Sequence, residues 1–105
     1  MAWIMLSIAG LLEVVWATAM KQSEGFTRPL PSAIMAVTLV GSFALLAVAM
    51  RTLPLGTAYT VWTGIGAVGA FVVGIVLMGE TLSSARLVAA LLILSGIVLM
   101  KLTSP

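Results

Sequence analysis

The chain alternates between long apolar runs and short polar breaks, a pattern typical of membrane-spanning helices. A helix needs about 20 apolar residues to cross the hydrocarbon core of a bilayer. The breaks between the runs collect charged residues, glycine and proline, as loops do. We expect helices at about residues 2–20, 32–50, 57–78 and 87–100, the last being the shortest. The sequence therefore predicts an all-α integral membrane protein with one domain over residues 1–105.

The overall composition indicates the same class. Of the 105 residues 62% are hydrophobic and only 8% are charged, and the mean hydropathy is +1.26. Such a chain has too little polar surface to cover a soluble globule. The absence of cysteine and histidine excludes disulfides, thiol chemistry and the usual zinc sites. We expect no metal, no cofactor, no nucleic-acid partner and no enzymatic activity.

Two segments resemble signals that belong to other kinds of protein. The first apolar run has the position of a secretory signal peptide, but it lacks a preceding basic residue and a small-residue cleavage site, and three more apolar runs follow. Gly64, Gly66 and Gly69 spell the dinucleotide-binding pattern GxGxxG. That pattern has meaning only where a strand turns into a helix. Here it lies inside an apolar helix, so we discard it.

The basic residues in the loops do not indicate one orientation of the chain in the membrane. Four crossings put Arg51 and Lys101 on one side of the membrane, against Lys21, Arg28 and Arg86 on the other. Cytoplasmic loops normally carry a clear excess of basic residues, and two against three is no clear excess. Either the amino terminus or the lipids decide one orientation, or both orientations are made. In the second case two copies pair antiparallel and present similar chemistry to both sides.

The small size of the chain favours an oligomer, because four helices do not easily enclose a path for a hydrated solute. Ala89 and Gly96 stand seven residues apart on one stripe of the last predicted helix. Small residues let helix backbones approach closely in lipid. This stripe is our candidate dimer seam, and the alternative is that it faces lipid.

Glu13 is the candidate functional group, because it lies near the centre of the first predicted helix. An ionisable side chain at that depth costs about 3 kcal/mol on insertion scales, and such residues usually face a bundle interior or a water-filled cavity. Desolvation favours the neutral acid, whereas an arriving cation favours the carboxylate. One side chain can therefore exchange a proton for a cation. The alternative is a protonated Glu13 that serves only as a structural hydrogen-bond donor.

Other polar and small residues lie at compatible heights. Gly10 and Trp16 share a helical face with Glu13, and glycine leaves space beside the carboxylate. Ser42 lies near the middle of the second helix, where we expect its hydroxyl to hold the carboxylate. These residues predict a polar site built by two helices.

The third helix offers an aromatic wall for a cation. Tyr59, Trp62 and Gly66 share one stripe, and aromatic faces attract cations, a planar guanidinium especially. For Tyr59 an interfacial position near the helix start is an equal alternative. Gly64, Gly66 and Gly69 weaken this helix; close packing is the usual role of such glycines, and a bend there would suit alternating access.

Several segments together resemble one transporter family. They are AGLLEVVWATAMK with its lone glutamate, SEGFTR, LPLGTAYTVWTGIGAVGA, and GE at the third turn. In these segments, their spacing and the total length, the chain resembles the small multidrug resistance (SMR) transporters. The resemblance implies a dual-topology, antiparallel homodimer in the bacterial inner membrane. It also implies that protons are exchanged for cations through Glu13.

Within that family, EVVWA and VWTGIGAVGA resemble the guanidinium exporter (Gdx) subtype. The resemblance implies proton-coupled export of guanidinium and small guanidinyl cations, with Glu13 binding cation and proton in turn. It also implies that Trp16 and Ser42 orient the carboxylate, while Tyr59 and Trp62 line the pocket and take part in switching. The stripe of Ala89 and Gly96 matches the family's dimer seam, except that glycine is common at position 89.

Three other interpretations stay open. The first is a multidrug exporter of the same family, which takes quaternary ammonium or polyaromatic cations. The second is a small accessory membrane subunit that transports nothing by itself, a role that gives no reason for a membrane-centred Glu13 beside Trp16. The third concerns assembly, since the chain is also compatible with a heterodimer that includes a sister chain.

Overall fold

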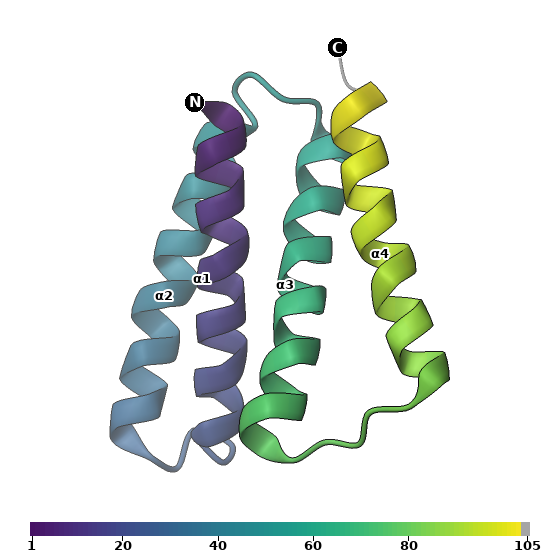
Figure 1. Ribbon diagram of the computed structural model, residues 1–105. Coiled ribbons are helices and arrows are strands. Elements are labelled where there is room, and N and C mark those ends of the chain that lie inside the picture. The colour runs from purple at the N-terminus through teal and green to yellow at the C-terminus, as the bar shows by residue number, and fades with distance from the viewer. Residues whose placement is uncertain (104–105) are drawn as a thin grey trace.

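The computed structural model describes residues 1–103 and consists there of four α-helices (Figure 1). In chain order they are α1 (Ala2–Gln22), α2 (Pro29–Ala49), α3 (Leu55–Met78) and α4 (Ser84–Thr103). All four are long and apolar enough to cross a membrane. The prediction of an all-helical chain with four membrane-length helices is therefore confirmed.

The four helices form a thin slab rather than a closed bundle. Helix α1 packs against both α2 and α3, and α4 lies at the outer edge, where its backbone approaches that of α3 within the described chain (Figure 1). The Cα positions span 43 × 35 × 16 Å. Successive helices run in opposite directions, so α1 and α3 are parallel to each other.

Helices α2, α3 and α4 begin earlier than the apolar pattern predicts, and for α2 and α4 the reason is local. Helix α2 starts at Pro29, because a proline is tolerated in the first turn, where the backbone N–H has no partner within the helix. Helix α4 starts at Ser84, and the Ser83 hydroxyl accepts the Arg86 N–H at 3.2 Å, which satisfies one of the free N–H groups of its first turn.

Local features mark the carboxyl-terminal ends of α3 and α4. Gly79 ends α3 in the left-handed conformation, with φ of 69°, which glycine adopts without steric cost. Helix α4 runs past Lys101 to Thr103 instead of ending at the lysine. The Lys101 ammonium lies 5.2 Å from the centre of the Trp3 ring, so it joins the ends of α4 and α1 through a cation–π contact.

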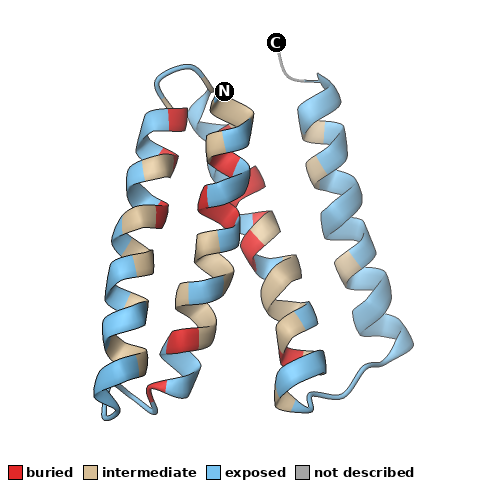
Figure 2. Cartoon of the chain, turned by 60° about the vertical axis from the view of Figure 1, so that its left-hand side comes forward, coloured by how far each residue is buried: buried red, intermediate tan, exposed pale blue. Residues whose placement is uncertain are grey.

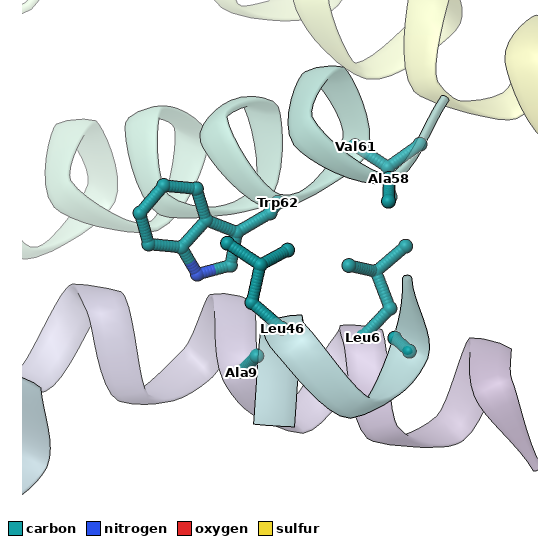
Figure 3. Close-up of a cluster of buried hydrophobic side chains, with 7 residues drawn as sticks. Leu6, Ala9, Leu46, Ala58, Val61 and Trp62 are labelled. Atoms are coloured by element: carbon teal, nitrogen blue, oxygen red, sulfur yellow. The ribbon is translucent and has the colours of Figure 1, made fainter. Parts of the chain in front are cut away.

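The buried hydrophobic core belongs to α1, α2 and α3 and lies toward the end of the slab that carries the amino terminus (Figure 2), and Figure 3 shows its side chains in close-up. None of the residues Ser84–Thr103 of α4 is buried. The first three helices therefore form one packed unit, and α4 turns most of its surface outward. The core cluster consists of Leu6, Ala9, Leu46, Ala49, Ala58, Val61 and Trp62.

We expect Leu6→Ala to destabilise the fold by about 2 kcal/mol or more, because Leu6 is fully buried and its truncation leaves a cavity. Leu77→Ala is the matched control, since Leu77 is 70% exposed, and a change on the outer surface is expected to stay within about 0.5 kcal/mol. Unfolding by sodium dodecyl sulfate in detergent micelles measures both. Equal losses in the two variants would contradict this location of the core.

Candidate functional site

Helices α1 and α3 pack against each other at three glycines. A Cβ added at Gly10 of α1 would lie 2.6 Å from the Cγ2 atom of Ile65. On α3, a Cβ at Gly66 would overlap the Glu13 carboxyl group, and one at Gly69 would overlap the Val14 side chain. These contacts follow one another down a seam between two parallel helices. Only residues without a side chain permit such close backbone approach.

The Glu13 carboxylate rests against Gly66 at the middle of this seam. Its Oε1 atom is buried and has no hydrogen-bond partner within residues 1–103. The indole N–H of Trp16, one turn further along α1, is buried and unpartnered in the same way. Buried polar groups are normally paired, and an unpaired one costs about 1–3 kcal/mol. The seam therefore holds one acceptor and one donor that the described chain does not satisfy.

A chain of hydrogen bonds crosses three helices next to the seam. The Trp62 indole N–H of α3 donates to the Ser42 hydroxyl of α2 at 3.0 Å, and that hydroxyl donates to the Ala9 carbonyl of α1 at 2.7 Å. Ser42 is fully buried and Trp62 nearly so. In this structure the Ser42 hydroxyl thus donates its hydrogen bond to the carbonyl of Ala9, one turn before Glu13. It does not donate to the Glu13 carboxylate, the partner that the sequence predicted. Ser42 fixes the orientation of the Trp62 ring.

Three aromatic side chains form a wall at the same end. The Trp62 ring lies 5.6 Å from Tyr59 and 5.5 Å from Phe43 between ring centres, distances typical of favourable aromatic pairs. The three rings border a cavity of about 400 Å³ between α2 and α3. Phe43 was not among the predicted site residues, although its position next to Ser42 was an available signal. Tyr59 is 53% exposed and also borders a groove between α3 and α4.

The glycines that the sequence predicted for the site and the bend contact different neighbours. The gap beside the carboxylate comes from Gly66, whereas Gly10 lies against Ile65. A Cβ at Gly64 would lie 2.8 Å from Ile97 of α4. Gly64, Gly66 and Gly69 thus make room for neighbours from α4 and α1, and α3 is one continuous helix from Leu55 to Met78. A bend at these glycines stays a prediction.

The two residues of the predicted dimer seam lie on the uncovered helix. Ala89 and Gly96 are exposed, and nothing in the described chain lies within 4 Å of a Cβ placed at Gly96. Both border grooves between α3 and α4, of about 180 Å³ at Ala89 and about 510 Å³ at Gly96. They lie apart from the Glu13 site.

Comparison with known proteins agrees with this architecture. The family described as Small Multidrug Resistance protein matches residues 1–93. Proteins named guanidinium exporter from Citrobacter freundii and Salmonella typhimurium are each 58% identical to the chain over 104 residues, covering 99% of both chains. One from Yersinia pseudotuberculosis is 59% identical over 104 residues, covering 99% of this chain and all of the relative.

These matches, together with four membrane-length helices, identify a transporter rather than an enzyme, with several passes through the bacterial inner membrane. The chain belongs to the small multidrug resistance family.

Proposed function

We propose that this protein is a proton-coupled antiporter that exports guanidinium and small guanidinyl cations. The observation that carries the proposal is the Glu13 carboxylate, which lies against Gly66 inside a membrane-length helix. One of its oxygens is buried and has no hydrogen-bond partner among residues 1–103. The relatives named guanidinium exporter, 58–59% identical over nearly the whole chain, supply the substrate class.

The chemistry of the site suits a planar cation. Guanidinium stays protonated at any physiological pH and offers N–H donors in a fixed plane. Two of these donors match one carboxylate, such as that of Glu13, in a bidentate pair. Its flat faces also stack on aromatic rings, which Trp62 and Tyr59 provide next to the seam.

Coupling follows from competition for one carboxylate. Glu13 binds guanidinium only when it is deprotonated, and a proton that binds from the acidic side removes that partner. A ligand shifts a conformational equilibrium only by its differential affinity for the two states. Exchange is therefore tightly coupled when the carrier switches its opening from one side of the membrane to the other with either a proton or a cation bound to Glu13. The empty, deprotonated carrier must switch only rarely.

The proposed transporter is an antiparallel homodimer. A slab only 16 Å thin does not surround Glu13 with protein, so a second copy is needed to complete the path. The uncovered stripe of Ala89 and Gly96 on α4 is the proposed seam between copies. Insertion in both orientations gives each side of the membrane the same chemistry, and a bend of α3 near Gly64, Gly66 and Gly69 is the proposed switching motion.

A second candidate function is export of quaternary ammonium or polyaromatic cations. The cavity of about 400 Å³ beside Tyr59 and Trp62 favours it, because Leu46, Ala47 and Met50 also line that cavity with apolar surface. Proton-coupled currents from pure protein in liposomes separate the candidates. Guanidinium but not tetrapropylammonium is expected to evoke a current, and silence with both cations would indicate an accessory subunit.

We expect Glu13→Gln to abolish the guanidinium-evoked current, because the amide keeps the size of the side chain but binds neither a proton nor a cation by charge. The folded assembly is expected to survive, which gel filtration in detergent checks. Glu24→Gln is the matched control, since Glu24 lies in the exposed loop between α1 and α2 and is expected to leave the current unchanged. Proton-coupled transport by the Glu13→Gln variant would sink the assignment.

We expect Gly66→Ala to weaken guanidinium binding at least about tenfold, or about 1.4 kcal/mol, because the added methyl group overlaps the Glu13 carboxylate. Combining it with Glu13→Asp, which shortens the acid by one methylene, is expected to recover part of the affinity. Isothermal titration of purified protein measures both effects. Gly56→Ala is the control on the same helix, since a Cβ there meets nothing within 4 Å in the part of the chain that the structure describes. Equal losses of guanidinium affinity in the two alanine variants would contradict a role for the contact between Gly66 and the Glu13 carboxylate.

A further inference from the structure

The guanidinium group of Arg86, in the first turn of α4, contacts three groups of different kinds. Its Nη2 atom lies 3.4 Å from Oε1 of Glu80, its Nη1 atom donates to the Thr81 carbonyl oxygen at 3.0 Å, and its Cζ atom lies 5.5 Å from the centre of the Phe71 ring. A carboxylate and a carbonyl oxygen accept hydrogen bonds from a guanidinium, and an aromatic face attracts its charge. Phe71, Glu80 and Thr81, which we call the Arg86 site, therefore offer the interactions that a guanidinium group favours.

The end of α3 fixes the position of Glu80 without help from Arg86. After Gly79 ends the helix in the left-handed conformation, the Glu80 N–H donates to the Gly74 carbonyl oxygen at 3.0 Å. The Glu80 carboxylate folds back over Gly74, where an added Cβ would lie 2.5 Å from its Oε2 atom. Phe71 belongs to the same helix and is half-buried. We therefore expect the acid and the ring to keep their places when the Arg86 side chain is removed.

The Arg86 head group is exchangeable. The side chains of Arg86 and Glu80 are each 47% exposed, and exposed ion pairs contribute little stability because solvent screens them and ordering two long side chains costs entropy. Arg86 keeps the advantage of its tether, which gives a linked partner an effective concentration on the order of millimolar. A free cation of the same shape and charge therefore competes with Arg86 at millimolar concentrations and above.

We propose that Phe71, Glu80 and Thr81 form a second guanidinium-binding site, which the Arg86 side chain fills in this structure and which free guanidinium fills when Arg86 leaves. The site shares no residue with the Glu13 site. Its ligand class follows from the head group that it already holds, whereas its relevance to the transported cation rests on the proposed function. A high concentration of guanidinium thus releases the start of α4 from Phe71 and Glu80.

Emptying the site tests whether it binds the free cation. In a Glu13→Gln background, which lacks the proposed transport site, Arg86→Ala is expected to bind guanidinium with a millimolar dissociation constant, and to bind methylammonium several-fold more weakly because that cation has the same charge but no planar fork of donors. Saturable shifts of the Glu80 and Thr81 amide signals, measured by NMR in micelles, report the binding. Equal affinities for the two cations, or no shift at these amides, would overturn the proposal.

Substitution of the acid tests which residue carries the binding. Adding Glu80→Gln to the Arg86→Ala variant is expected to remove the Thr81 amide shift, because the amide side chain no longer offers a charge to the cation. Glu24→Gln is the matched control, since Glu24 is an exposed acid in the loop between α1 and α2, and it is expected to leave the shift unchanged. Equal effects of the two substitutions would contradict a site at Glu80.

The exchange itself is tested with Arg86 in place, so the result does not depend on how the alanine variant folds. In Glu13→Gln protein, guanidinium is expected to move the Arg86 Nε–H signal toward that of free arginine, while an equal concentration of methylammonium moves it much less. The signal of Arg51, an exposed arginine between α2 and α3, is the internal control. An Arg86 signal that stays fixed, or that follows both cations equally, would overturn the exchange.

The two proposals fail in different ways. No guanidinium-evoked current from the unmodified protein would overturn the proposed function and leave the Arg86 site untouched, because both NMR experiments use protein without the Glu13 acid. A normal current from the unmodified protein, combined with no guanidinium-specific shift at Thr81 or Arg86, would overturn the second site and leave the function intact.

Discussion

The contact between the Glu13 carboxylate and Gly66 is the constraint on which the rest of the structure depends. A membrane helix that carries an acid must give it a place other than lipid, and α3 provides one by omitting a side chain at position 66. The same omission at Gly10 and Gly69 holds α1 and α3 together above and below the acid. The same seam between α1 and α3 thus provides both the close helix packing and the place of the Glu13 carboxylate.

Around this seam the helices divide their roles. Helix α2 contributes Ser42, whose hydrogen bonds join Trp62 to the backbone of α1 and so hold the aromatic wall beside the acid. Helix α4 adds no buried residue within Ser84–Thr103. The first three helices therefore carry the proposed chemistry, and the fourth presents the surface at which a second copy is proposed to bind.

The proposed exchange of protons for guanidinium needs an acid that is shielded but reachable. Shielding comes from the partly buried position of Glu13 and from the absence of a hydrogen-bond partner for its Oε1 atom in the described chain.

The sequence by itself determined the class and the four helices, and it singled out Glu13 as the candidate site, because apolar runs of membrane length and a lone acid inside one of them are local signals. Local patterns could not show which glycine faces the acid, since this depends on the register of α1 against α3. The tertiary structure alone decided that Gly66 and not Gly10 makes the gap, that Ser42 bonds to Ala9, and that Phe43 joins the aromatic wall. It also brought Glu80 back over Gly74, because a turn at Gly79 reverses the chain in a way that residue spacing does not reveal.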